Sequence, residues 1–395
     1  MLLSISIILL SGLFAGWLCK TIRFPALFGM ILAGILVGPY GLGLLDASIL
    51  DISSELRRIA LIIILIRAGL KLDLSDLKKV GRPAVLMCFV PACLELLGML
   101  LIAPRLLGLT LLESAILGAV VAAVSPAVVV PRMIRLIDEG RGTREGIPQM
   151  ILAGASVDDV FVIVLFTTFT GLAQGGSVSW LSFVSIPFSI ALGVAAGMAV
   201  GALLHWFFSR SALTRTTQVI LVFAVSFVLN WVESAAVFPF AGLIAIMALG
   251  TEVRRRSAEM ARGLSDVFDQ LWVSAELFLF VLVGASVAID SARTAGPAAV
   301  ALILGVLLFR MLGVYLCVLG TGLTGKEKLF CMLAYTPKAT VQAAIGGLPL
   351  AMGLPCGSIV LTVSVIAILI TAPAGAFAID LTYRRFLSAE AVPEV

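Results

Sequence analysis

The sequence predicts an all-α protein that crosses a lipid bilayer many times. Hydrophobic residues make up 61% of the 395 residues, and charged residues make up only 13%. Soluble proteins average roughly 45–50% apolar and about 25% charged residues. Apolar stretches of about 20 residues, the length of a membrane-spanning helix, follow one another along almost the whole chain. Prolines in the middle of two stretches predict helices that open inside the membrane.

Short charged segments divide the chain into about thirteen apolar stretches, each of which we interpret as a transmembrane helix. They cover residues 2–18, 24–41, 57–72, 84–107, 113–134, 148–172, 181–208, 214–232, 236–250, 271–291, 297–320, 327–352 and 357–381. The first stretch has neither a basic start nor a small-residue cleavage site, so we expect a membrane helix there and not a signal peptide.

The distribution of positive charge predicts which way the chain crosses the bilayer. Lysine and arginine are enriched in cytoplasmic loops. Of the 27 Lys and Arg residues, one set of alternate connections holds only Arg57, Arg58, Arg105 and Arg293, while nearly all the others lie in the opposite set. We therefore expect a multi-pass protein of the cell (inner) membrane with its N-terminus outside and its C-terminus in the cytoplasm.

The two halves of the chain resemble each other. Three pairs of segments match: residues 24–34 with 237–250, residues 65–73 with 282–290, and residues 123–131 with 334–342. Halves that are separated by an odd number of helices have opposite orientations in the membrane, which is the inverted-repeat plan of many secondary transporters. We predict a first repeat of about six helices, a linking helix, a second repeat of about six helices and a short cytoplasmic tail. Their bounds are residues 1–172, 181–208, 214–385 and 386–395.

The third pair of segments carries a proline in mid-span in both halves. Pro126 follows a serine and Pro337 follows a threonine. Proline removes a backbone donor and clashes with the preceding turn, so each helix is expected to break. A plain kink in a packed bundle would explain one such proline, but two in repeat-related places favour broken helices that line a polar cavity.

Two adjacent carboxylates mark the candidate site. Asp158 and Asp159 are flanked by apolar residues inside the predicted span 148–172. An ionised carboxylate at the centre of a bilayer costs at least about 2.5 kcal/mol, so this pair is expected to serve a function. Small hard cations prefer oxygen ligands. We therefore expect Asp159 and Asp158 to bind a transported Na⁺ or Li⁺, together with Ser156, Ser125 and the carbonyl groups around Val124.

Three further charged residues are predicted to lie near this site. Lys338 follows the second proline, where its charge would neutralise half-helix carbonyls or pair with Asp158. Glu95 and Arg310 lie in the spans that precede the two broken helices, at similar distances from the prolines. This correspondence predicts a Glu95–Arg310 ion pair, for which a structural role is favoured over a direct role in ion binding.

The motifs resemble those of the monovalent cation/proton antiporter superfamily, and in particular the Na⁺/H⁺ antiporters of the NHA type. The matching strings are FPALFGMILAGILVGPYG, AVSPAVVVP, ASVDDV and TPKATVQAAIG. The resemblance implies a core transport domain, a dimerisation domain, a homodimer, elevator-like alternating access and a role in pH homeostasis. It also implies that Asp159 is the main ion- and proton-binding residue and that Asp158 is its partner. Electrogenic relatives carry a lysine where this chain has Arg310, which leaves the number of protons per cation open.

Several alternatives remain at the level of sequence. A K⁺/H⁺ antiporter would use the same oxygen ligands, and a sodium-coupled symporter of an organic anion would use similar broken helices. A membrane-bound sensor is a third alternative. The chain has no G-x-x-x-x-G-K-[ST] phosphate loop, which disfavours an ATP-driven pump. We expect a secondary transporter and no enzyme, with no cofactor and no nucleic-acid partner.

Overall fold

The computed structural model describes residues 1–22, 24–71, 81–174, 180–211, 213–235, 240–287 and 289–388. Every regular element within these ranges is a helix, as the sequence predicts. The helices in chain order are α1 Leu2–Thr21, α2 Ala26–Val37, α3 Ala47–Asp51, α4 Ser53–Lys71, α6 Arg82–Met87, α7 Val90–Leu107, α8 Leu111–Val121, α9 Pro126–Asp138, α10 Ile147–Ala173, α11 Trp180–Arg210, α12 Arg215–Ser234, α13 Gly242–Arg256, α14 Ala258–Ala285, α15 Ile289–Cys317, α16 Gly325–Ala334, α17 Thr340–Ile345, α18 Leu348–Ala351 and α19 Gly357–Phe386.

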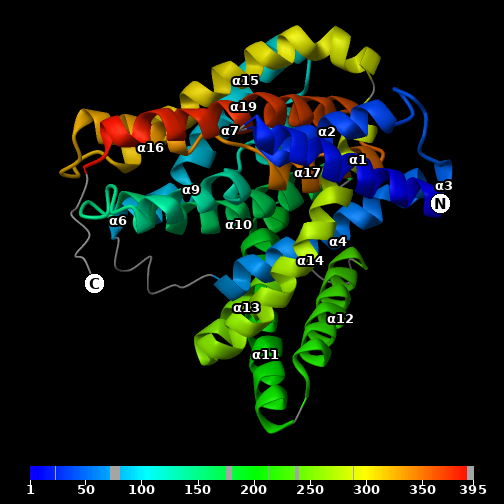
Figure 1. The fold of residues 1–395 in the computed structure, drawn as a ribbon, viewed down its shortest axis with the longest axis vertical. Helices are drawn as coiled ribbons and strands as arrows, with labels where there is room; N and C mark the ends of the chain where they lie inside the picture. Colours follow the sequence, from blue (N-terminus) through cyan, green and yellow to red (C-terminus); the bar gives the residue numbers. More distant parts are fainter. Residues whose placement is uncertain are drawn as a thin grey trace. The chain divides into compact units, whose positions relative to one another are not determined.

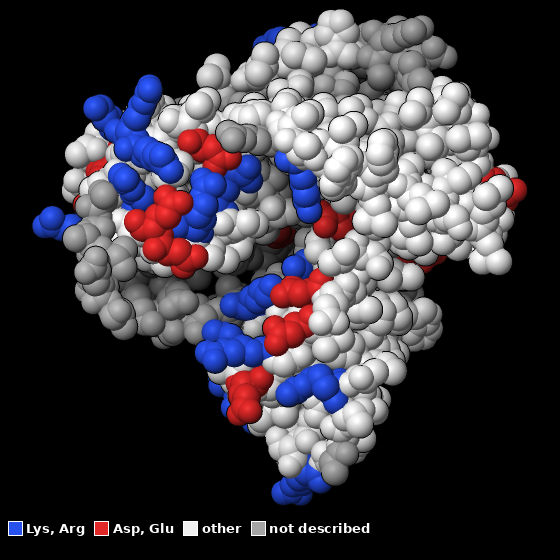
Figure 2. Space-filling view, in the orientation of Figure 1, with Lys and Arg blue, Asp and Glu red and all other residues white. Residues whose placement is uncertain are grey.

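Long apolar helices dominate the described part of the chain. Within it, nine helices or pairs of consecutive helices are long and apolar enough to cross a membrane, and the apolar helices Ala26–Val37 and Thr340–Ala351 are shorter. The face of the molecule in Figure 2 shows wide areas without a charged side chain, while lysine, arginine and carboxylate side chains gather in patches. Both observations fit a protein whose main solvent is lipid.

The chain forms two compact units. Unit 1 contains residues 1–54, 75–169 and 279–395, and unit 2 contains residues 55–74 and 170–278. The division does not coincide with the predicted division into repeats, because each unit draws on both halves of the chain. The predicted repeats are a relation between sequences, whereas the units are defined by packing.

Unit 2 is built around close packing between α11 and α13, with α12 on α13 (Figure 1). A side chain at Gly197 of α11 would collide with the Ala245 carbonyl of α13. Glycine therefore lets the two backbones approach closely, as small residues do at interfaces between membrane helices.

Unit 1 holds both helices that the prolines interrupt. The first is split into α8 and α9, and the second into α16 and α17, with Pro126 and Pro337 at the breaks. α8 and α16 begin with the same capping box, Thr110 with Glu113 and Thr324 with Glu327, in which threonine and glutamate satisfy each other's backbone N–H groups. These matching starts add a further similarity between the two predicted repeats.

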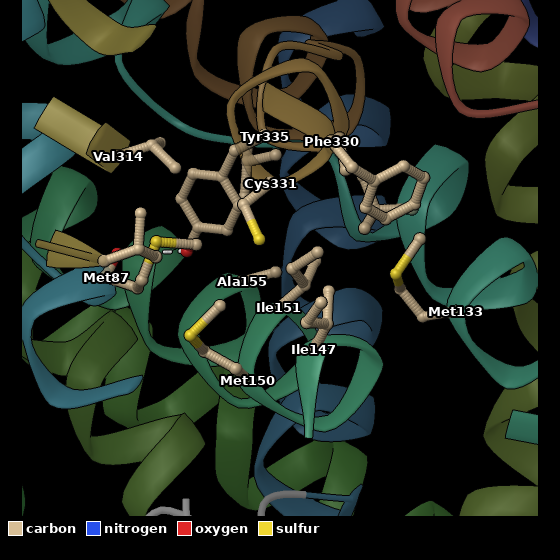
Figure 3. Close-up of a cluster of buried hydrophobic side chains, with 14 of the residues drawn as sticks. Met87, Met133, Ile147, Met150, Ile151, Ala155, Val314, Phe330, Cys331 and Tyr335 are labelled. Carbon is tan, nitrogen blue, oxygen red and sulfur yellow. Dashed lines mark hydrogen bonds between the residues drawn. The ribbon is translucent and has the colours of Figure 1, made fainter. Parts of the chain in front are cut away.

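A buried hydrophobic cluster in unit 1 includes Val124 and Tyr335, each two residues before a break proline (Figure 3). It joins α6, α9, α10, α15, α16 and α19, and includes Met87, Met150 and Tyr335. Tyr335 is the last residue before the second break, and its hydroxyl donates a hydrogen bond of 3.0 Å to the Met87 carbonyl. The cluster thus supports the start of the break with apolar packing and one hydrogen bond.

Candidate functional site

The two helix breaks contact each other directly. The Ser125 N–H, at the start of α9, donates a hydrogen bond of 2.7 Å to the Pro337 carbonyl in the other break. Each break therefore satisfies a backbone group that the other frees. Irregular backbone at membrane depth requires such partners or a polar cavity.

α10 presents Asp158 to the first break. The side chain is fully buried. Its Oδ2 atom accepts a hydrogen bond of 2.8 Å from the Val124 N–H and one of 3.0 Å from Arg310 Nη2. The backbone N–H of Val124 thus contacts the carboxylate pair, where the sequence suggested its carbonyl group. Asp158 is held by one backbone donor and one cation.

Arg310 of α15 is the central cation of the site. It donates to Glu95 Oε2 at 2.8 Å and to the Tyr335 carbonyl at 2.6 Å, and it also donates to the Ala122 carbonyl. Its guanidinium group lies 5.0 Å from the centre of the Tyr335 ring. The structure brings Glu95 and Arg310 together, as their spacing suggests. It also reveals Tyr335 as a support, for which the sequence pattern held no signal.

Lys338 follows Pro337 in the second break and is fully buried. Its Nζ atom lies 2.7 Å from Glu95 Oε1 and donates to the Val121 carbonyl at 2.7 Å. The predicted contact with half-helix carbonyls is present. The alternative, a pair with Asp158, is absent from the described contacts, because Arg310 binds Asp158 while Glu95 binds Lys338.

Asp159 differs from its neighbours because no described residue forms an ion pair with it. The residue is 7% exposed, and its Oδ1 atom has no hydrogen-bond partner among the described residues. The same holds for Asp158 Oδ1 and Ser125 Oγ. Ser125 occupies the N-cap position of α9 but does not use its hydroxyl for capping. The side chain of Ser156 lies outside the described residues.

Comparison with known proteins identifies the family. The family model described as "Sodium/hydrogen exchanger, transmembrane" matches residues 6–380. The chain belongs to the sodium/hydrogen exchanger family. It is 36% identical to the mouse protein named sodium/hydrogen exchanger 9B2, over 98% of this chain and 74% of that protein. It is 31% identical to human sodium/hydrogen exchanger 9B1, over 98% and 78% of the two chains.

The fold of this exchanger is also found in a solved structure. The sodium proton antiporter MjNhaP1 from Methanocaldococcus jannaschii, determined at pH 8, superimposes with a TM-score of 0.83 at 20% sequence identity, and 97% of each chain is covered. An identity this low shows the shared fold and no more. The predicted all-α membrane fold and the predicted family are confirmed.

Proposed function

We propose that this exchanger moves sodium ions and protons in opposite directions across a membrane, and that the two ions compete for Asp159. The single observation that carries the proposal is the charge balance of the buried site. Glu95, Asp158, Arg310 and Lys338 form a connected set of two anions and two cations. Asp159 is left without a cation, so a proton or a metal ion is needed to balance its charge.

Buried oxygen atoms that lack a hydrogen-bond partner among the described residues suit a small alkali ion as substrate. Asp159 Oδ1, Asp158 Oδ1 and Ser125 Oγ have no hydrogen-bond partner among the described residues. Small hard cations prefer such oxygen ligands. Na⁺ and Li⁺ are the proposed substrates, and K⁺ is the runner-up because oxygen ligands alone do not exclude it. No cofactor takes part, since binding and release of the two ions need no covalent chemistry.

The same charge balance supports an exchange of one proton for one cation. Asp158 contacts Arg310 and the Val124 N–H, so only Asp159 changes its occupant. One positive charge then replaces another. We expect the transport rate in proteoliposomes to be the same whether or not K⁺ and valinomycin clamp the membrane potential. A rate that rises when the potential is clamped would show net charge movement and contradict this stoichiometry.

The wider features of transport form part of the proposal. We place the protein in the cell membrane as a homodimer, with its N-terminus outside and its C-terminus in the cytoplasm. The charge asymmetry of the loops supports this orientation. The predicted inverted repeats and the contact between the two breaks support elevator-like alternating access, in which the broken helices carry the ion.

Dissipation of a pH gradient in proteoliposomes tests the proposal. Addition of Na⁺ or Li⁺ should dissipate the gradient with the wild-type protein, and Asp159→Asn should abolish this signal. Asp269→Asn is the matched control, because this half-exposed aspartate lies in α14 of unit 2. A cation-dependent signal that persists in Asp159→Asn would overturn the role of this carboxylate.

A further inference from the structure

Three consecutive carbonyl groups, from the last residue of α8 and the two residues that follow it, all accept hydrogen bonds from side chains of the second half of the protein. The Val121 carbonyl accepts from Lys338 Nζ at 2.7 Å and from Gln342 Nε2 at 3.1 Å. The Ala122 carbonyl accepts from Arg310, and the Ala123 carbonyl accepts from Gln342 Nε2 at 2.9 Å. The C-terminal end of α8 is therefore capped by two cations and one neutral amide.

These carbonyl groups lie beside the carboxylate pair. Arg310 joins the Ala122 carbonyl to Asp158, and the next backbone N–H, that of Val124, donates to the same carboxylate. The C-terminal end of a helix carries partial negative charge, and the open ends of half-helices coordinate Na⁺ in other transporters. In this protein, carbonyl groups that would suit a cation are engaged by protein donors.

Gln342 is the neutral member of the capping set. It lies on α17, is 1% exposed, and uses its amide nitrogen for both of its carbonyl contacts. The opposite amide orientation would place Oε1 against two carbonyl oxygens, so the hydrogen bonds fix the orientation. Its Oε1 atom has no hydrogen-bond partner among the described residues. Gln342 can be changed without altering the charge balance of the site.

We propose that Gln342 is a specificity-determining residue, which favours Na⁺ and Li⁺ over K⁺ by keeping the Ala123 carbonyl away from the transported ion, while Lys338 shares the Val121 carbonyl with it. Rings of backbone carbonyls replace the hydration shell of K⁺ in potassium channels, where the number and field strength of the carbonyl groups influence selectivity. Occupied carbonyls leave carboxylates as the strongest ligands, and these favour the smaller ions. This inference rests on the proposed cation exchange.

The variant Gln342→Met tests the inference because it keeps the length of the side chain and removes both donated hydrogen bonds. Lys338 still occupies the Val121 carbonyl, but the Ala123 carbonyl loses its donor. We expect the ratio of kcat/KM for Na⁺ to that for K⁺ to fall by about tenfold or more, while kcat for Na⁺ stays within about twofold. The change should appear as a higher KM for Na⁺ and a lower KM for K⁺.

Gln218→Met is the matched control. Gln218 lies on α12 of unit 2, is 8% exposed, and accepts a hydrogen bond of 3.1 Å from Arg215. Its substitution should leave the ratio of kcat/KM for Na⁺ to that for K⁺ within about twofold of the wild-type value. An unchanged ratio in folded Gln342→Met, with Na⁺ transport reduced, would overturn the inference and leave Gln342 a structural role.

A second variant and a second measurement keep the inference testable if Gln342→Met fails to fold. Gln342→Asn keeps the amide but is too short to hold both carbonyl groups. Thermal stabilisation of the detergent-solubilised protein by added NaCl, LiCl or KCl reports binding without turnover. We expect the thermal stabilisation by K⁺ to rise relative to the stabilisation by Na⁺ in Gln342→Asn. If the ratio of these two stabilisations stays at its wild-type value, the inference is contradicted.

The two proposals fail in different ways. Absence of cation-dependent proton flux in folded wild-type protein would overturn the proposed antiport. The specificity role alone would be overturned if Asp159→Asn abolishes the wild-type flux while both Gln342 variants keep the wild-type preference for Na⁺ over K⁺ in transport and in thermal stabilisation.

Discussion

Two groups of charged residues in this exchanger have the same connectivity but opposite environments. In unit 1, Glu95 is shared between Arg310 and Lys338, and all three side chains are at most 1% exposed. In unit 2, Asp269 is shared between Arg67 and Lys71, with 37%, 20% and 52% of the side chains exposed. Each group places one carboxylate between two cations. The first group also has the carboxylate of Asp158 in contact with Arg310.

The difference in burial decides what each group can do. Water screens exposed ion pairs, which typically contribute about 0–1 kcal/mol each. A buried charge must be balanced within the protein, and removal of one partner typically costs about 3–5 kcal/mol. The buried group therefore fixes which carboxylate is paired and which is not, and this supports the proposal that Asp159 is the exchangeable site. The exposed group has no such constraint.

Arg310→Met should produce the largest effect on stability. The substitution leaves one cation, Lys338, to balance the two anions Glu95 and Asp158. It also removes the hydrogen-bond donor of the Ala122 and Tyr335 carbonyls. We expect a loss of about 3–5 kcal/mol in the free energy of unfolding, measured by unfolding in detergent micelles.

A double variant sharpens this prediction. Glu95→Gln added to Arg310→Met again balances the buried charges, with Lys338 facing Asp158. We expect the double variant to be more stable than Arg310→Met alone by about 1–3 kcal/mol, because the energies of coupled residues are not additive. If the two substitutions destabilise additively, the four residues do not act as one charge-balanced set.

Asp269→Asn should produce the smallest effect. The substitution removes the carboxylate between Arg67 and Lys71, but both cations retain access to water, and Arg67 also lies 5.1 Å from the centre of the Trp272 ring. We expect a loss of about 1 kcal/mol or less, which diminishes at high salt. A loss as large as that of Arg310→Met would show that exposure does not separate the two groups.

Local sequence patterns predicted the breaks well, because proline acts on its own helix. α9 begins at Pro126, and Pro337 lies in the irregular segment between α16 and α17. Helix ends were harder to predict where charged residues lie inside a helix and lower its mean hydropathy. The predicted span 271–291 begins late, since α14 already begins at Ala258 and carries charged residues along its first turns. Hydropathy detects the apolar part of a helix and not its full length.

Contacts within the site depended on how distant segments cross, which single-sequence patterns do not encode. The spacing of Glu95 and Arg310 suggested their pairing because it repeats in both halves. The ion pair between Lys338 and Glu95 did not follow from spacing, and the sequence suggested half-helix carbonyls or Asp158 as the partners of Lys338. The capping role of Gln342 was also missed, because its carbonyl partners belong to the other repeat and backbone groups leave no trace in the sequence.

The dependence of the KM for Na⁺ on pH is the most direct test of competition at Asp159. If a single carboxylate binds either a proton or Na⁺, each tenfold rise in proton concentration should raise the KM about tenfold on the acidic side of the activity profile, while kcat stays nearly constant. Initial rates of pH-gradient dissipation in proteoliposomes provide both constants. A KM that does not change with pH, with only kcat varying, would show that the two ions do not compete and would contradict the account.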